Sequence, residues 1–235
     1  METIEAFKRR AGIVTDRRLP TESDDLGWLC LMQHFRSPTR LLDWSENLLV
    51  ALYFAVSEDM DQAGEVWAML PWGLNQKAMG RWCIPLTTSR HLKYLLIQPH
   101  WHGTAQALAK HVDCPEPMRL PLAIQPPMMF PRMAVQSSTF TIHPPPEGTS
   151  TIQEVLPESK PLVRYIVPAE SKATLLSALR VLGFSHGHLF PDLEGLSQMI
   201  AFDNRELTYS PPEPPPCSGE AITEAADEGN AAMAL

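Results

Sequence analysis

Apolar residues recur at helical spacing along several stretches of this chain, and each stretch has boundary residues typical of a helix. Ser23 or Asp24 can cap the stretch that begins at Leu26, Gly12 follows the stretch over 2–11, and Gly183 follows the stretch over 168–182. Pro191 begins a further helix, with Leu193, Leu196 and Ile200 on one face. The spacing of three to four residues predicts amphipathic helices over residues 2–11, from Leu26 to Gln33, over 46–57 and over 168–182.

Shorter apolar runs predict strands. Residues 66–70 end at a proline, residues 133–143 alternate towards Phe140 and Ile142 before three prolines, and residues 162–167 are rich in β-branched side chains. Residues 91–97 fit either a helix or a strand, and we leave that choice open. Strands alternating with helices predict an α+β fold, a mixed small sheet with packed helices.

The densest polar segment runs from Gln33 to Trp44, immediately before the apolar 46–57 helix. Such side chains are costly beside a core unless they bind one another or a ligand. Ser37-Pro38 predicts the start of a single helical turn, which Asp43 or Ser45 would re-cap, with Asp43 and Glu46 as a variant capping box. The segment is therefore a candidate site.

Composition divides the chain at about residue 205. The formal net charge of the chain is -8. Six acidic residues lie beyond Arg205, where there is no Lys or Arg, so residues 1–205 are nearly neutral. We predict one α+β domain over 1–205 and a Pro-rich, acidic, disordered tail over 206–235. The near-neutral body gives no indication of nucleic-acid binding.

Cysteine and hydropathy patterns exclude other classes. The four cysteines are scattered without a Cys-x-x-Cys pair, and His100-x-His102 and His186-x-His188 have no carboxylate or thiol at ligand spacing. We therefore expect free thiols, no metal site and no resident cofactor. No stretch is apolar enough to span a membrane and the N-terminus lacks a secretory signal, so we expect a cytoplasmic protein.

Three motifs together resemble the FRG domain, a prokaryotic family named for an N-terminal Phe-Arg-Gly motif. The resemblance spans roughly residues 2–205 and rests on these motifs: Gln33-His34-x-x-x-Pro38-Thr39-Arg40-Leu41-Leu42-Asp43-Trp44 followed by Ala51-Leu52-Tyr53-Phe54-Ala55, then Arg132-x-x-x-Gln136-x-x-x-Phe140-Thr141, then Phe190-Pro191-Asp192-Leu193-Glu194-Gly195-Leu196.

The Phe-Arg-Gly motif itself is missing, because the family places it upstream of the segment that matches residues 2–11. Phe35-Arg36-Ser37 lies inside the motif from Gln33 to Trp44 and does not replace it. We expect either a misassigned start codon or a shortened domain. The resemblance implies the fold and kinship, and it leaves the reaction unassigned.

Each candidate residue has a structural and a functional interpretation. Gln33 and His34 either bind a ligand or tie the second helix to the turn. For Arg40 we favour an internal pair with Asp43 over clamping a phosphate or carboxylate. Thr39 orients a ligand hydroxyl or bonds within the turn, and Trp44 stacks on a ligand or packs in the core. Gln136, on a predicted strand, either faces a cleft or makes a hydrogen bond to residues behind the cleft wall.

Three hypotheses for function follow. The first is binding of a small polar or nucleotide-like ligand in a pocket between the Gln33–Asp43 turn and the Gln136 strand, with Gln33, His34, Thr39, Arg40, Asp43, Trp44 and Gln136 as the ligand-binding set. The second is a group-transfer enzyme resembling the ADP-ribosyltransferases, which would use NAD and lacks its first motif here. The third is a non-catalytic regulator that binds a protein partner through the tail.

Overall fold

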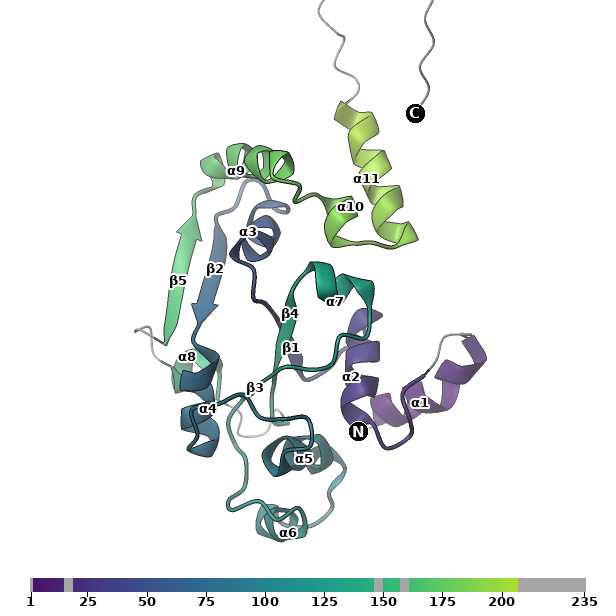
Figure 1. Cartoon of the computed structure of the whole chain (residues 1–235), viewed down its shortest axis with the longest axis vertical. Coiled ribbons are helices and arrows are strands. Elements are labelled where there is room, and N and C mark those ends of the chain that lie inside the picture. The colour runs from purple at the N-terminus through teal and green to yellow at the C-terminus, as the bar shows by residue number, and fades with distance from the viewer. Residues whose placement is uncertain (1, 15–18, 146–149, 157–160, 207–235) are drawn as a thin grey trace, which may run out of the picture. The chain divides into compact units, whose positions relative to one another are not determined.

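The computed structural model describes residues 2–14, 19–145, 150–156 and 161–206 (Figure 1). The packing divides the chain into the units Met1–Met199 and Ile200–Leu235, and every contact discussed below lies within the first. The predicted disordered tail lies outside the described residues from 207 onward. In chain order, the first half contains α1 (Glu2–Val14), α2 (Asp25–His34), β1 (Leu41–Ser45), α3 (Leu48–Val56), β2 (Gly64–Met69), α4 (Pro71–Met79), α5 (Arg90–Ile97), η1 (Gln98–His100) and α6 (Ala105–His111).

The second half of the described chain adds three strands and five helices: β3 (Leu122–Ile124), α7 (Pro131–Val135), β4 (Ser138–Ile142), α8 (Ile152–Val155), β5 (Leu162–Val167), α9 (Ala169–Val181), α10 (His186–Leu189) and α11 (Leu193–Glu206). Many helices with small antiparallel sheets make this the predicted α+β fold. No helix among the described residues is long and apolar enough to cross a membrane.

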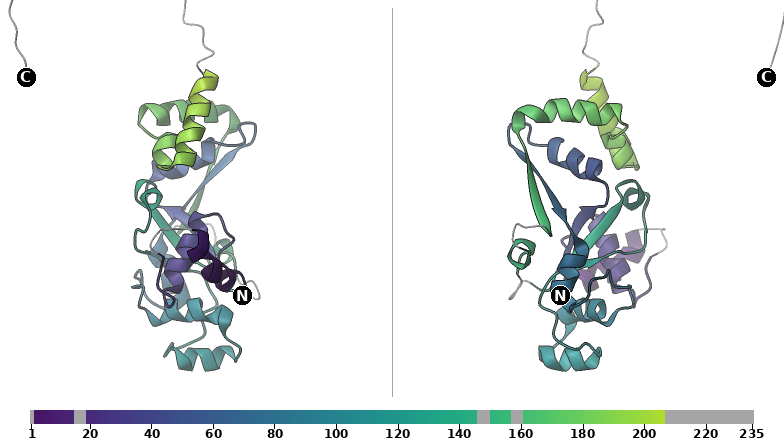
Figure 2. Two further views of the ribbon diagram at one scale, coloured as in Figure 1. Left: turned by 90° about the vertical axis from the view of Figure 1, so that its right-hand side faces the viewer. Right: turned by 60° about the vertical axis from the view of Figure 1, so that its left-hand side comes forward.

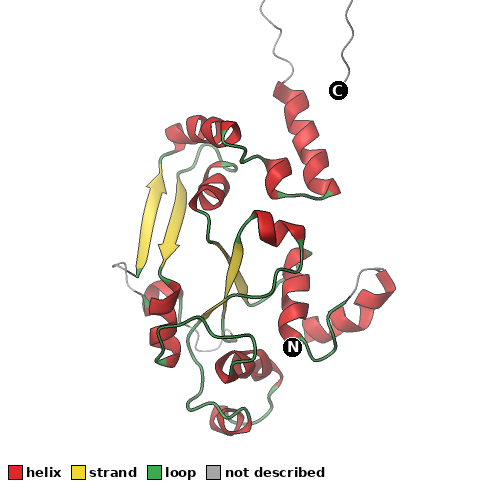
Figure 3. Cartoon of the chain, in the orientation of Figure 1, coloured by secondary structure: helices red, strands yellow, loops and turns green. Residues whose placement is uncertain are grey.

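The strands form two separate antiparallel sheets (Figure 3). One has the order β1-β4-β3, with Leu41 opposite Ile142 and Ser45 opposite Ser138, and the other pairs β2 with β5. β1 is therefore an edge strand. The ladder bond from His143 N to Arg40 O shows that alternate residues of β1 bond to β4, so the backbone polar groups of Asp43 point towards the free edge.

Three clusters of buried apolar side chains hold these elements. The largest packs α1, α2, α5 and α6 against the three-stranded sheet. A second joins α3, α9 and α10 at one end of the β2-β5 pair (Figure 2). The third lies between α4, α8 and the two sheets, with Trp44 and Trp67 at its border. Trp44 is thus partly a core residue, as one of its two interpretations had it.

The predicted helices form where local capping signals support them. Asp24 accepts a hydrogen bond from Gly27 N at the start of α2, at 2.9 Å. Gly183 follows α9 with a φ of 90°, a left-handed conformation that suits glycine. The first helix runs past Gly12 to Val14, so glycine does not end it. Residues 91–97, left open, lie in the helix α5, and the expected strands at 66–70 and 162–167 are β2 and β5.

Two predictions for the polar segment and its partner are wrong. Leu41–Ser45 is a strand rather than part of a helical turn, and Asn47, not Asp43 or Ser45, caps α3 by accepting from Leu49 N at 2.9 Å. The capping box of Asp43 and Glu46 does not form. The strand forms because β4 pairs with it from about a hundred residues away, and no local pattern carries that information.

The predicted strand over 133–143 is also too long. Pro131 begins the short helix α7, Gln136 follows that helix, and β4 begins only at Ser138. Ser137, with a φ of 48°, makes the break between helix and strand. Gln136 therefore lies at a helix end and not on a strand.

Candidate functional site

A cavity of about 1030 Å³ lies where the free edge of β1 faces β2 and the loop between α7 and β4. Six of the seven predicted site residues line it: Gln33, His34, Thr39, Asp43, Trp44 and Gln136. Arg40 does not. The cavity volume matches the upper end of the range for small-molecule pockets, roughly 300–1,000 Å³.

A hydrogen-bonded chain joins α2 to β1 on one wall of the cavity. Gln33 Nε2 donates to Asp43 Oδ2 at 2.7 Å, and the Thr39 hydroxyl donates to Gln33 Oε1. Leu41 N in turn donates to Thr39 Oγ1 at 3.2 Å. The protein itself thus satisfies both ends of the Gln33 amide, which fixes the position of the Asp43 carboxylate.

The Asp43 carboxylate faces the cavity and remains accessible to solvent from it. Protein atoms surround it on its other sides, and this burial raises the pKa of Asp43. The hydrogen bond from Gln33 and the positive charge of Arg132 act in the opposite direction. Asp43 is therefore an accessible acceptor in a partly desolvated setting, where a hydrogen bond from a ligand is strengthened.

Aromatic rings form much of the remaining wall. The His34 ring stacks on Phe130, with centroids 4.1 Å apart and an interplanar angle of 4°. Trp44 Nε1 donates to Thr141 Oγ1 at 3.2 Å, and that hydroxyl also lies 3.0 Å from His143 Nε2. Because the indole N–H has a protein partner, Trp44 offers a ligand its ring surface.

Hydrogen bonds of Gln136 stabilise one end of the cavity wall. Its Nε2 donates to Leu189 O of α10 at 2.9 Å, and its backbone oxygen accepts from Ser45 Oγ at 2.7 Å. Both bonds join segments distant in the sequence. The arrangement brings Gln136 to the same cavity as Asp43, although on a helix end rather than on the predicted strand.

Arg40 corrects the prediction of an internal pair with Asp43. Its Nη1 donates to His143 O at 2.7 Å and its Nη2 to Leu95 O at 3.0 Å, so the guanidinium joins the end of β4 to α5. Burial lowers the pKa of Arg40 to about 10, and the side chain stays charged at neutral pH. Side chains at positions 40 and 43 leave opposite faces of a strand, which is why the expected pair does not form.

Two arginines that the sequence reasoning did not select also line the cavity. Arg36 Nη2 lies 3.3 Å from Glu194 Oε1, and Arg132 Nη2 lies 3.4 Å from Asp192 Oδ2. The Arg132 guanidinium also stacks 4.4 Å above the ring of Phe190. Arg132 and Phe190 stood in the motifs that carry the FRG resemblance, so the sequence held a signal for them.

The cysteine nearest the site is not a nucleophile. Cys30 borders the cavity but is 2% exposed, and burial raises its pKa to about 12. Cys114 is also buried, Cys83 is exposed, and Cys217 lies outside the described residues. Among the described residues, no three His, Cys, Asp or Glu side chains converge as metal ligands would.

Comparisons with known proteins bear on the first part of the chain. A search of curated proteins and a search of solved structures each found no match. The family model of the FRG domain matches residues 1–64, which include α1, α2, β1 and α3. The match covers the segment that carries the Gln33–Trp44 motif, and over that part the chain is similar to the FRG domain, in agreement with the resemblance.

Proposed function

We propose that this chain binds a small polar or nucleotide-like ligand in the cavity between β1, β2 and the end of α7. The observation that carries the proposal is the convergence of Gln33, His34, Thr39, Asp43, Trp44 and Gln136 on one hollow. These residues come from two segments of the sequence about ninety residues apart, Gln33–Trp44 and the end of α7. A cavity that combines aromatic surfaces with a few fixed polar groups is typical of a small-molecule site.

The polar groups favour a ligand with hydrogen-bond donors and a flat ring. The Asp43 carboxylate, held by Gln33 at 2.7 Å, is an acceptor for a hydroxyl or an amine. The stacked rings of His34 and Phe130, together with Trp44, offer surfaces for a base or a similar ring. A sugar joined to a planar ring has both features, which is the reason for naming nucleotide-like ligands.

The first experiment is a thermal-unfolding screen against nucleosides, nucleotides, NAD and simple sugars, followed by calorimetric titration of any ligand that raises the midpoint. A ligand at 100 times its dissociation constant adds about 2.7 kcal/mol to stability, which is about 5–10 °C for a chain of this size. Release of nicotinamide from NAD would favour the group-transfer alternative.

A cavity-filling variant makes the screen specific. Ala51 on α3 borders the cavity, so Ala51→Leu is expected to fill part of it and to weaken binding at least tenfold. Ala107→Leu places the same side chain on an exposed position of α6 and should leave binding unchanged. The proposal fails if no ligand of the screen binds, or if Ala51→Leu binds as well as the unmodified chain.

A further inference from the structure

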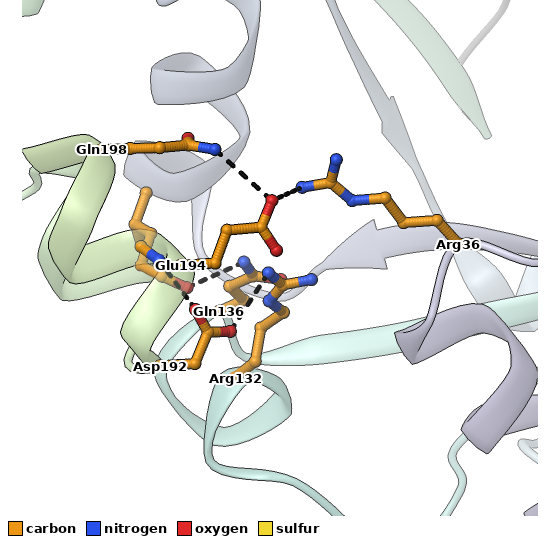
Figure 4. A network of polar contacts seen from close by, with 8 residues as sticks. Arg36, Arg132, Gln136, Asp192, Glu194 and Gln198 are labelled. Atoms are coloured by element: carbon orange, nitrogen blue, oxygen red, sulfur yellow. Dashed lines mark hydrogen bonds and ion pairs between the residues drawn. The ribbon is translucent and has the colours of Figure 1, made fainter. Parts of the chain in front are cut away.

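Phe190, just after α10, borders the cavity, and residues from there to the first turn of α11 make polar contacts with cavity residues (Figure 4). Arg36 pairs with Glu194, Arg132 pairs with Asp192, and Gln136 bonds to the backbone of α10. The three partners on the cavity side all line the hollow. We call the two arginines the rim pair.

The rim pair and its two carboxylates form one electrostatic group. Burial lowers the pKa of His186, and the charges of Arg132, Asp192, Glu194 and Arg36 all act on the same imidazole. Arg132 also acts on the carboxyl of Asp43 inside the cavity. Arg132 is thus near both the interior acceptor and the rim.

The carboxylates hold the rim pair weakly. Their closest N–O distances are 3.3 and 3.4 Å, whereas charge-assisted hydrogen bonds of full strength measure about 2.7–2.9 Å. The side chains of Arg36 and Glu194 are 67% and 59% exposed, and exposed pairs contribute little to stability. The Arg36 guanidinium can therefore exchange its partner at small cost. Arg132 and Asp192 are more enclosed, with side chains 18% and 37% exposed, and their long contact of 3.4 Å leaves room for a closer anionic partner.

Arg132 has a hydrogen-bond donor that the protein does not use. Its Nε is buried and has no acceptor among the described residues, which is uncommon for a buried polar group. Arg132 Cζ lies over the Phe190 ring, 4.4 Å from its centroid. The N–H donors of a guanidinium lie in its own plane, where an oxyanion accepts two parallel bonds.

We propose that the ligand of this cavity carries a phosphate group, which Arg36 and Arg132 bind in place of Glu194 and Asp192. Two guanidiniums from different segments suit a dianion better than a single carboxylate. Glu194 and Asp192 are the anionic partners that the phosphate would replace, one at each guanidinium. This inference rests on the proposed function and narrows its ligand class to phosphorylated molecules.

The test compares ligands that differ only in their phosphate. Calorimetric titrations use adenosine and AMP, uridine and UMP, ribose and ribose 5-phosphate, with inorganic phosphate alone as a further arm. Each phosphorylated member is expected to bind about tenfold or more tightly than its partner, and the preference should shrink as salt is added. Inorganic phosphate should bind weakly, since it lacks the groups that the cavity contacts.

Variants of the rim separate a phosphate site from a purely structural tie. Arg132→Gln and Arg36→Gln should each weaken AMP binding about tenfold and so reduce or remove the preference of the chain for AMP over adenosine. Asp192→Asn and Glu194→Gln should tighten AMP several-fold, because the competing charge is gone. Arg90, the first residue of α5, lies 3.2 Å from Asp113, which follows α6, and neither residue lines the cavity. Arg90→Gln and Asp113→Asn are therefore matched controls that should have no effect.

The outcomes are distinguishable. Equal binding within each ligand pair, or an unchanged preference in both arginine variants, overturns the phosphate site and leaves the proposed function standing. Binding of no ligand in any pair overturns the proposed function and this inference with it. Should Arg132→Gln fail to fold, the exposed variants Arg36→Gln and Glu194→Gln decide the matter.

Discussion

Asn75 is the polar side chain whose loss should damage this fold most. It is completely buried on α4, and its Nδ2 donates to Cys83 O at 2.8 Å and to Ala123 O at 3.0 Å. Its Oδ1 accepts from Ala123 N at 2.8 Å. The amide thus replaces a neighbouring strand along the free edge of β3, the strand of Leu122–Ile124.

The cost of Asn75→Ala follows from the groups it leaves behind. Ala123 is 4% exposed, so its N–H and C=O both lose their partner in a place where water cannot replace it. A buried polar group without a partner costs about 1–3 kcal/mol. Allowing for relaxation, we expect a loss of about 3–5 kcal/mol, a large part of the roughly 5–15 kcal/mol that stabilises a domain.

Urea unfolding, followed by tryptophan fluorescence, measures this loss. Gln76→Ala, on the next and exposed residue of α4, is the control and should stay within about 0.5 kcal/mol of the unmodified chain. A loss below about 1 kcal/mol for Asn75→Ala would show that the edge of β3 does not depend on this amide.

Three further changes test other parts of the account. Arg40→Leu should lower the free energy of unfolding by about 2 kcal/mol, because two backbone carbonyls lose a charged donor. Ligand affinity measured by calorimetry should not change, and a loss of affinity would contradict a purely structural role for Arg40. Gly195→Ala should destabilise the turn before α11 by about 1–3 kcal/mol in urea unfolding, because a Cβ there would overlap the Phe190 carbonyl oxygen; an unchanged midpoint would refute this. Burial, and then the charge of Arg40, lowers the pKa of His143 in the folded chain. The His143 imidazole therefore binds a proton more readily in the unfolded chain, and the stability of the fold decreases as the pH drops below about 6.5. The urea midpoint should decline less in His143→Gln than in the unmodified chain between about pH 7 and pH 5, and equal declines would exclude His143 as a cause.

Local signals were sufficient for α1, α2, α3 and α9 and for the strands β2 and β5, whereas they left α5 open and assigned part of α7 to a strand. The cap at Asp24 and the glycine after α9 stand within a few residues of the elements they bound. The edge strand β1 could not be predicted in this way, because its conformation depends on pairing with β4, with Leu41 opposite Ile142. The same residues match a helix-cap pattern, which wrongly predicted a helical turn there.

In the candidate site, too, local features were predictable from the sequence and long-range contacts were not. The polar density of the Gln33–Trp44 segment marked it as a site or a polar cluster, and the structure makes it the wall of a cavity. The partners of Arg40 lie 55 and 103 residues away, and the tie between Arg36 and Glu194 spans 158 residues. Contacts over such separations leave no periodicity in the sequence, so the partners of Arg40 and of the rim pair could not be predicted from it, although Arg132 itself stood in a family motif.

The most direct test of the central claim is an amide NMR titration of the isotope-labelled chain with AMP. If the cavity is the binding site, the backbone signals of Gln33, Asp43 and Gln136 shift together along one saturation curve, while those of α5 and α6 stay in place. Shifts confined to α5 and α6, or no saturable shift at all, would contradict the claim that these residues surround a ligand site.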